Sequence, residues 1–267
     1  MTIDVRAAAL QWLAAVRPAV VVEVLAHKGS VPREAGTRML VAADEVIGTI
    51  GGGHLELKAI ADARAVLAQG GGAQLQSLLQ HVALGPSLGQ CCGGVLDLRF
   101  TPLAAAEPDK WALAKSRFTL QLYGAGHVGR AIVRLLAGIP CSVQWIDERD
   151  GEFPAEVLPP HIQRVCVEPV QAEVATAGPG AFYLVLTHSH DLDMVISQAI
   201  LQRGDFGYFG LIGSKSKRAR FEHRLRERGV AHGLIDRMVC PIGVAGIAGK
   251  EPEVIAVAVV AQLLQIC

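Results

Sequence analysis

The chain has 267 residues, of which 51% are hydrophobic and 19% are charged, enough for one large or two medium domains with buried cores. It carries 25 Lys and Arg against 25 Asp and Glu, a balance that gives no overall field to recruit nucleic acid or an anionic membrane. The first residues lack the basic-then-apolar layout of a signal peptide, and no apolar run reaches the roughly 18 residues that a membrane span needs. We therefore expect a cytoplasmic protein that binds neither nucleic acid nor membranes.

The first hundred residues predict a smaller α/β domain. An expected helix over residues 3–15 leads into the apolar strand AVVVEVLAH at 19–27, and short β-like segments follow before residue 100. Two prolines and several small residues then interrupt the pattern. We therefore place the first domain at residues 1–103 and a linker at 104–116.

From Phe118 onward, apolar runs of strand length alternate with helical patterns. FTLQLYGAG precedes HVGRAIVRLLAG, and AFYLVLTHS precedes DLDMVISQAILQRG. Such alternation is typical of a parallel sheet that helices cover on both faces. The predicted fold is therefore α/β, with a smaller N-terminal α/β domain followed by a Rossmann-like parallel-sheet domain over residues 117–267.

A glycine motif of the dinucleotide-binding type follows the first strand of the second domain. Gly124, Gly126 and Gly129 are spaced as GxGxxG at the start of a predicted helix, and Asp147 ends the next strand, 18 residues after Gly129. In dinucleotide-binding folds such glycines let a pyrophosphate approach the helix start, and the acid binds the ribose. The alternative is a glycine turn that serves packing alone and binds no nucleotide.

A glycine triplet in the first domain has similar properties. Gly51, Gly52 and Gly53 lead into a predicted helix that carries His54 and Glu56. Three glycines in a row can cradle an anion or let the backbone approach a flat ligand. The alternative is a simple turn, although three glycines beside two ionisable residues exceed what a turn requires.

A basic helix start lies in GLIGSKSKRAR. Ser214 and Lys215 follow a predicted strand, and Lys217, Arg218 and Arg220 come next. Cations at a helix N-terminus oppose the helix dipole unless an anion is present. This conflict points to a phosphate site, and a solvated basic face is the competing interpretation.

The stretch THSHDLD at 187–193 partly resembles the HxHxDH signature of binuclear metallohydrolases. Asp191 and Asp193 straddle the required position, and the final histidine is missing. A strand-to-helix turn with Asp191 near the helix start is the simpler interpretation.

Two adjacent cysteines, Cys91 and Cys92, stand in LGQCCGGVLDL at 88–98. Neighbouring Cα atoms lie about 3.8 Å apart, which is too close for an unstrained disulfide at about 5.5–6 Å. The flanking glycines leave the backbone free to approach a ligand, and a thiolate is both a metal ligand and a nucleophile. We predict Cys91 and Cys92 as metal ligands, against a tight turn with one thiol packed and one incidental.

Taken together, these stretches resemble the XdhC family, the accessory proteins of bacterial xanthine dehydrogenase. The matching pieces are KGSVPREAGTRMLV, GTIGGGHLE, LGQCCGG, YGAGHVG, THSHDLD, FGLIGSKSKRARF and CPIGVAGIAGKEPEVIAVAV, in the family's order. One departure is PIGVAGIAGKEP, which puts Ala245 or Gly246 where broader relatives have an aspartate. An acidic role at that position is therefore not carried over.

The resemblance implies an XdhC/CoxI-type N-terminal domain, a Rossmann-like C-terminal domain and a role as a chaperone more than as an enzyme. Members of the family are thought to bind molybdenum cofactor (molybdopterin), to assist its sulfuration by a cysteine desulfurase, and to help insert it into xanthine dehydrogenase. The expected cofactor-binding residues are Gly51, Gly52, Gly53, His54, Glu56, Cys91, Cys92, Gly124, Gly126, Gly129, Asp147, Ser214 and Lys215, with Cys91 and Cys92 as metal ligands. We expect no catalytic residues, and a homo-oligomer such as a dimer.

Two competing functions remain open. The alternative from another class is an NAD(P)-dependent oxidoreductase, which rests on the GxGxxG motif and Asp147 and is less favoured than the carrier. A structural adaptor that binds partner proteins and no cofactor is the third possibility.

Overall fold

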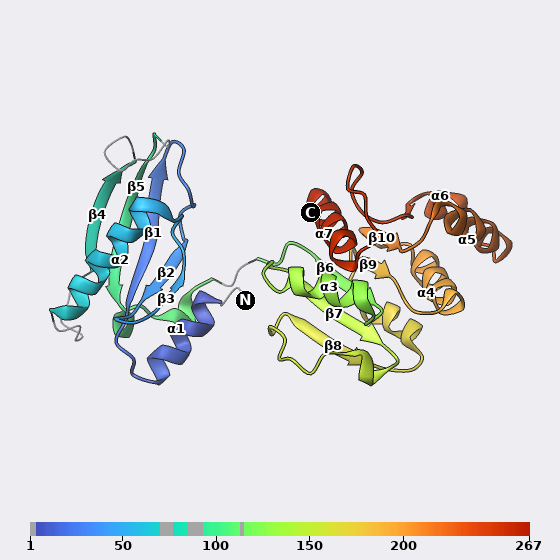
Figure 1. The fold of residues 1–267 in the computed structure, drawn as a ribbon, viewed down its shortest axis with the longest axis horizontal. Coiled ribbons are helices and arrows are strands. Elements are labelled where there is room, and N and C mark those ends of the chain that lie inside the picture. The colour runs from blue at the N-terminus through green and yellow to red at the C-terminus, as the bar shows by residue number, and fades with distance from the viewer. Residues whose placement is uncertain (1–3, 70–76, 85–92, 113–114) are drawn as a thin grey trace. The chain divides into compact units, whose positions relative to one another are not determined.

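The computed structural model describes residues 4–69, 77–84, 93–112 and 115–267. The chain forms two compact units, residues 1–113 (unit 1) and residues 114–267 (unit 2), drawn in Figure 1. Cys91 and Cys92, the predicted metal ligands, lie outside the described residues.

Unit 1 is built on an antiparallel sheet with the strand order β3-β2-β1-β5-β4. Its elements are α1 (Val5–Ala14), β1 (Val20–Lys28), β2 (Arg38–Val41), β3 (Val46–Gly48), α2 (Gly53–Ala68), β4 (Leu78–Ala83), β5 (Val95–Pro102) and the 3-10 turns η2 (Leu103–Ala105) and η3 (Pro108–Lys110). The two 3-10 turns contact α1, so the segment after β5 packs within unit 1.

Strand β1 is apolar on both faces because a helix covers each face of the sheet. Val20, Val22 and Val24 pack in the core that includes α2, whereas Val21 packs in a second core with α1. Side chains alternate between the two faces of a strand. The continuous valine run is therefore the pattern of a strand that is buried on both sides.

The face of β1 that carries Val21 also carries a buried acid, Glu23. Glu23 lies in register with Arg38 on β2 and with Arg99 on β5, and its carboxylate accepts hydrogen bonds from both guanidinium groups. The Arg38 guanidinium also lies over the ring of Trp111, 4.7 Å from its centroid. These contacts join three strands through one carboxylate.

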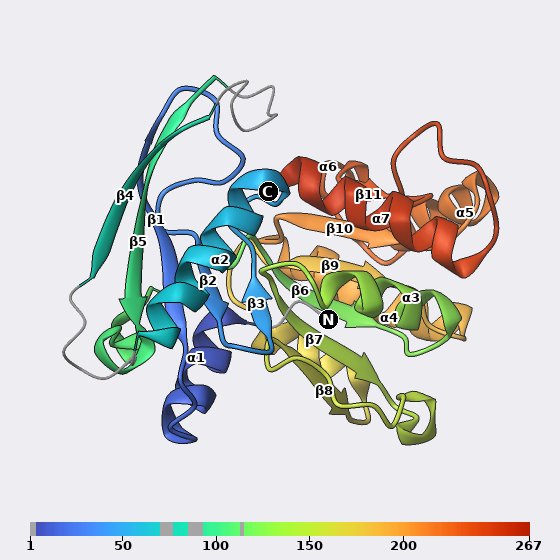
Figure 2. The same ribbon diagram turned by 60° about the vertical axis from the view of Figure 1, so that its left-hand side comes forward.

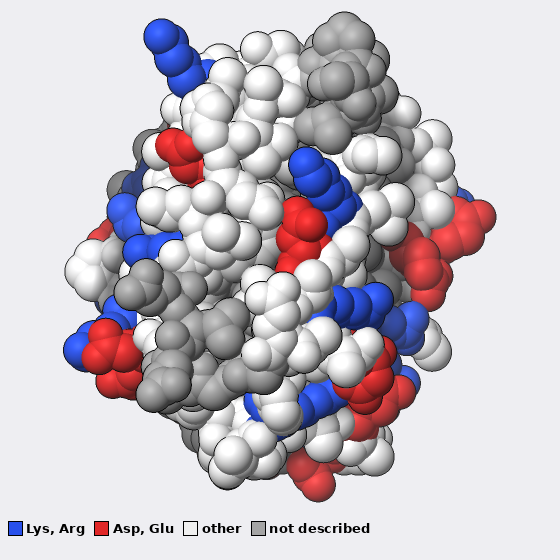
Figure 3. All heavy atoms as spheres, turned by 90° about the vertical axis from the view of Figure 1, so that its left-hand side faces the viewer, with Lys and Arg blue, Asp and Glu red and all other residues white. Residues whose placement is uncertain are grey.

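Figure 3 shows one face of the molecule. Where it draws described residues, basic and acidic side chains lie next to one another instead of gathering in separate areas. This mixture agrees with the equal numbers of acidic and basic residues in the sequence.

Replacing Glu23→Gln should lower the free energy of unfolding of unit 1 by about 1–3 kcal/mol, because two guanidinium groups lose a charged acceptor. Asp97→Asn in the same sheet is the matched control, since among the described residues the Asp97 side chain pairs with His81 alone and both side chains are exposed. Urea unfolding followed by circular dichroism measures both variants. Equal and small losses for the two variants would contradict the assigned role of Glu23.

Unit 2 is built on a parallel sheet with the strand order β11-β10-β9-β6-β7-β8. Its elements are β6 (Thr119–Tyr123), α3 (His127–Leu136), β7 (Ser142–Asp147), η4 (Asp150–Glu152), β8 (Ile162–Cys166), η5 (Val170–Thr176), β9 (Phe182–Val185), α4 (His190–Arg203), β10 (Tyr208–Leu211), α5 (Lys215–Glu227), α6 (His232–Asp236), β11 (Met238–Val239) and α7 (Pro252–Ile266). Counted within the unit, this order is 3-2-1-4-5-6, the order of dinucleotide-binding Rossmann domains.

Helices cover both faces of this parallel sheet. Helices α3 and α7 pack in one core, and η5, α4, α5 and α6 pack in the other; Figures 1 and 2 show the two sets from different sides. The predicted α/β class, with a Rossmann-like parallel sheet and a smaller N-terminal region, is confirmed.

Helix α7 is the most continuously apolar helix of unit 2, and it packs Ala256, Val259 and Leu263 into the core that it shares with α3. Across the described ranges, no helix combines the length and the apolar character that crossing a membrane requires.

Candidate functional site

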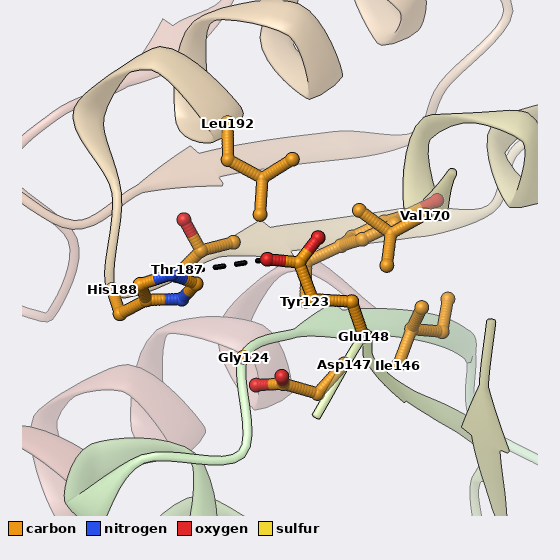
Figure 4. A pocket seen from close by; sticks show the side chains of 9 residues that line it. All are labelled: Tyr123, Gly124, Ile146, Asp147, Glu148, Val170, Thr187, His188 and Leu192. Atoms are coloured by element: carbon orange, nitrogen blue, oxygen red, sulfur yellow. Dashed lines mark ion pairs between the residues drawn. The ribbon is translucent and has the colours of Figure 1, made fainter. Parts of the chain in front are cut away.

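The clearest candidate site lies at the carboxyl ends of three adjacent strands of unit 2. The strand order reverses between β6 and β9, and ligands of open α/β sheets bind at such a switch point. A small hollow lies there (the pocket of Figure 4), with no room for a water molecule between its walls, lined by Tyr123, Gly124, Ile146, Asp147, Glu148, Val170, Thr187, His188 and Leu192. The predicted GxGxxG turn and Asp147 therefore come together at one place.

The three glycines of the turn between β6 and α3 differ in whether the surrounding atoms leave room for a side chain. A Cβ at Gly124 would lie 2.3 Å from the carbonyl oxygen of Leu186, and its φ of +117° also favours glycine. A Cβ at Gly129 would lie 2.1 Å from the carbonyl oxygen of Gly124. A Cβ at Gly126 would meet no described atom within 4 Å. Packing therefore explains Gly124 and Gly129 and gives no reason for Gly126.

Gly126 directly precedes helix α3, and none of the described side chains caps the helix there. The first N–H groups of a helix have no partner within the helix, and together with the helix dipole they favour an anion. Because Gly126 has no side chain, an anion can approach these groups closely. The start of α3 is therefore suited to a phosphate group.

Asp147 ends β7 and is buried, with 5% of the residue exposed. Its Oδ2 accepts hydrogen bonds from the Ala125 N–H (2.7 Å) and from Nη2 of Arg149 (3.0 Å), and Oδ1 accepts from the backbone N–H and Nε of Arg149 (both 3.0 Å). Burial alone would raise the pKa of Asp147, but these hydrogen bonds outweigh it and hold the pKa below its ordinary value. Both oxygens are thus engaged, Oδ2 by the glycine turn and Arg149 and Oδ1 by Arg149, and a ribose would have to compete for them.

Glu148 follows Asp147 and points the other way, into the pocket, as Figure 4 shows. Its side chain is 27% exposed, and its Oε1 lies 3.8 Å from Nε2 of His188, which is longer than a hydrogen bond. No hydrogen bond to this carboxylate occurs among the residues that the structure describes. Glu148 is therefore the acid at this edge of the sheet that has acceptors to offer.

The glycine triplet of unit 1 already holds an anion, which the chain itself provides. The carboxylate of Glu56, one turn into α2, accepts hydrogen bonds from the N–H groups of Ile50 (3.0 Å) and Gly52 (3.1 Å) and from the hydroxyl of Thr49. A Cβ at Gly51 would lie 2.3 Å from Cβ of Pro32, so this glycine also serves packing. Glu56 occupies the acceptor position that the sequence interpretation left for an external ligand.

The next two predicted ligands, Gly53 and His54, lie at the start of α2. Gly53 begins α2, and His54, the next residue, is exposed. Among the predicted ligands in the described part of unit 1, the His54 side chain is the one that faces solvent.

The basic start of α5 is also largely satisfied from within. Ser214 caps the helix by accepting a hydrogen bond from the Lys217 N–H (3.3 Å). Lys217 is buried, and its Nζ lies 2.5 Å from Oδ2 of Asp193, whose Oδ1 accepts from the N–H and hydroxyl of Thr187. The hypothesis that Lys217 binds an external phosphate is therefore wrong for this structure, whereas Lys215 is exposed.

The stretch THSHDLD forms a strand-to-helix turn. Helix α4 begins at His190 after the cap residue Ser189, which places Asp191 in the first turn. The turn contributes Thr187 and His188 to the pocket. Sequence reasoning did not assign Glu148 or His188 to this crevice; the available signal was that each follows the end of a strand adjacent to β6.

Comparison with known proteins identifies the family. Residues 120–263 match the XdhC Rossmann domain, and residues 12–79 match the XdhC and CoxI family. The chain belongs to the XdhC family. The resemblance predicted from the sequence motifs is therefore confirmed.

Two further similarities accompany this assignment. The chain is 30% identical over 259 residues to the uncharacterized protein YqeB of Escherichia coli K12, covering 93% of this chain and 43% of YqeB, so it spans less than half of that relative's length. A crystal structure of a xanthine dehydrogenase from Bacillus halodurans aligns with a TM-score of 0.72 and 19% identity, over 98% of this chain and 95% of that chain. At this identity, the likeness shows a shared fold.

Replacing Asp147→Asn should lower the free energy of unfolding of this XdhC protein's unit 2 by roughly 1–3 kcal/mol near neutral pH, because the Ala125 N–H and Arg149 lose a charged acceptor. The folded-state pKa of Asp147 lies below that of an unfolded Asp, about 3.9. The wild-type advantage is therefore fully present above about pH 4 and is lost as the pH falls through the folded pKa.

Urea unfolding of wild type and Asp147→Asn near neutral pH and at about pH 3 measures this effect. Asp205→Asn is the control, because Asp205 has its own arginine, Arg203 at 2.7 Å, on the exposed surface. A difference between wild type and Asp147→Asn that stays constant into the acid range would show that the charge of Asp147 is not what fixes the turn.

Proposed function

We propose that this XdhC-family protein is a maturation factor that binds molybdenum cofactor, supports its sulfuration by a cysteine desulfurase, and inserts it into xanthine dehydrogenase. Family membership supports a role of this kind. In this proposal the cofactor is cargo, carried and handed on, and supplies no chemistry on this chain. The chain needs no acid–base pair of its own for such a task.

The observation that most directly supports the proposal is Gly126, a glycine for which packing gives no reason. Gly126 borders open space at the uncapped start of α3, whereas packing alone accounts for Gly124 and Gly129. A phosphate that approaches the helix start needs that space. Molybdopterin carries one phosphate, the group that an uncapped helix start of this kind suits.

An NAD(P)-dependent oxidoreductase is the second candidate. The strand order and the GxGxxG turn favour it, but the acid at the ribose position, Asp147, has both oxygens engaged by Ala125 and Arg149. Purification from cells that make molybdenum cofactor, followed by absorbance and mass spectrometry of the released ligand, separates the two. Stoichiometric pterin supports the carrier, nicotinamide dinucleotide with turnover supports the enzyme, and tight partner binding with no ligand supports the adaptor.

Replacing Gly126→Val should leave melting within a few degrees of wild type, since the new side chain enters open space, and should lower copurified molybdenum cofactor about tenfold or more by blocking the phosphate. Gly178→Val is the matched control. Gly178 also borders open space among the described residues, but it precedes β9 at the opposite end of the strand from the pocket. Molybdenum content is measured by mass spectrometry, and normal content in Gly126→Val would make the motif architectural only.

Replacing Cys91→Ser and Cys92→Ser, singly or together, should retain the fold and lose cofactor retention or transfer of the sulfurated form, because a hydroxyl cannot replace a thiolate ligand or nucleophile. Both cysteines lie outside the described residues, and Cys141→Ser, at a buried thiol of unit 2, is the control for cysteine loss as such. The measurements are thermal melting, bound molybdenum and reconstituted xanthine dehydrogenase activity. A double variant with a normal melting temperature, normal bound molybdenum and full xanthine dehydrogenase activation would contradict the proposed role of the two cysteines.

A further inference from the structure

Three arginines form a row along one side of helix α5. Arg220, Arg224 and Arg228 are spaced four residues apart, so their side chains are neighbours on the surface of the helix. All three residues are exposed, and we call them the arginine row. Like charges at this spacing repel one another and weaken a helix, so the row does not serve the stability of α5.

Other cations of α5 have partners within the chain. Nζ of the buried Lys217 lies 2.5 Å from Asp193. Arg218 donates to Glu222 (2.6 Å) and to the Met238 carbonyl group (2.8 Å). These two side chains attach α5 to the rest of unit 2.

The arginine row is engaged much more weakly. Nη1 of Arg224 lies 4.0 Å from Asp191, which is too long for a hydrogen bond, and Nη1 of Arg228 donates to the neutral Gln198 (2.7 Å). Among the residues that the structure describes, Arg220 has neither an ion pair nor a hydrogen-bond partner for its side chain. The helix dipole favours cations in the last turn, which does not apply to Arg220 in the middle of the helix.

Several other arginines near the surface lie directly against carboxylates. Arg17 lies 2.6 Å from Glu45, and Arg203 lies 2.7 Å from Asp205. The sequence holds equal numbers of cationic and acidic residues, so the arginine row departs from this local pairing. Its guanidinium groups have donors to offer to carboxylates of another molecule.

The surroundings of the arginine row favour a protein over a nucleic acid as that molecule. Asp191, whose side chain is 94% exposed, lies beside Arg224, and the exposed Glu227 follows Arg224 by three residues on the same side of α5. These acids would repel a phosphate backbone, whereas a protein can place its own cations against them.

An apolar side chain adds to this argument. Val195 is exposed on α4, four residues after Asp191 and so on the same side of that helix. Helices α4 and α5 pack in the same core and lie on the same face of the sheet (Figures 1 and 2). Arginine next to apolar surface is typical of protein interfaces.

We propose that the arginine row is a docking surface for a partner protein that presents a row of carboxylates. A guanidinium group forms two parallel hydrogen bonds with a carboxylate, and complementary charge speeds association and fixes the register of two surfaces. Helix α3 packs on the other face of the sheet. The inference therefore goes beyond the proposed function, because it assigns a protein-binding surface apart from the proposed phosphate site.

The test uses the full-length protein and two probes, poly-L-glutamate and xanthine dehydrogenase; the choice of the second probe rests on the proposed function. The double variant Arg220→Glu/Arg224→Glu should bind both probes about tenfold or more weakly than wild type, and wild-type binding should weaken as salt is added. Biolayer interferometry measures both effects. Melting should stay close to that of wild type, because both side chains are exposed.

The double variant Arg134→Glu/Lys250→Glu is the matched control. It makes the same change of net charge at two exposed residues of unit 2, and Arg134 lies on α3, on the other face of the sheet. It should bind both probes as wild type does. If the arginine-row variant melts early, Arg220→Gln replaces it, and it should weaken binding of both probes by a smaller factor.

Four results overturn the proposal: no binding of poly-L-glutamate by wild type, equal losses in the arginine-row variant and the control, unchanged xanthine dehydrogenase binding in the arginine-row variant, or binding of a short DNA duplex that this variant loses. The proposed function is read separately, from the molybdenum and pterin content of the purified protein, which the arginine-row variant should leave unchanged. If xanthine dehydrogenase does not bind wild type, the proposed function loses its acceptor, and poly-L-glutamate decides the role of the arginine row.

Discussion

The hydrogen bond from the Ala125 N–H to Asp147, 2.7 Å long, fixes the geometry on which the crevice depends. It ties the turn after β6 to the end of β7. The carbonyl oxygen of Gly124 accepts a hydrogen bond from Nε1 of Trp145 (3.0 Å), and Gly129 packs against that same carbonyl group. With the turn held at these points, the start of α3 and the pocket keep a defined relation to each other within unit 2.

The same physical arrangement recurs where the sequence suggested other anion sites. Glu56 accepts from the turn before α2, and Asp193 accepts from Thr187 and pairs with the buried Lys217. A glycine-rich turn or a basic helix start therefore has two physical explanations, an external anion or a carboxylate of the chain. The start of α3 differs because Asp147 engages Ala125, before the helix, and leaves the N–H groups beyond Gly126 without a cap among the described side chains.

Sequence patterns were sufficient for the fold because each pattern reports local burial. The valine run of β1 and the strand–helix alternation after Phe118 follow directly from which faces are covered. Partners far apart in the chain are a different matter: Lys217 and Asp193 are separated by 24 residues, and no periodicity specifies that they meet. From the sequence alone, a lysine at a helix start is therefore interpreted as solvated or ligand-binding, because the sequence does not identify the acid that pairs with it in the fold.

For the neighbouring acids Asp147 and Glu148, the glycine motif did not indicate which carboxylate points into the hollow. The spacing from the glycine motif selects Asp147, and that residue does lie at the turn, but as an internal clamp. Both acids line the hollow, but consecutive side chains at a strand end point in opposite directions, and Glu148 is the one whose carboxylate points into it. Alternation along the strand was the signal available for Glu148, and motif spacing alone does not use it.

A crevice of this kind suits a carrier better than a tight-binding enzyme site. In the part of the chain that the structure describes, it offers one helix start without a side-chain cap and one carboxylate, Glu148, that accepts no hydrogen bond, beside a hollow too small for a water molecule. A ligand gains few hydrogen bonds there and keeps much of its surface in water, which limits affinity. On the proposed function that limit is useful, because cargo bound through few contacts can be handed to an acceptor that offers more of them.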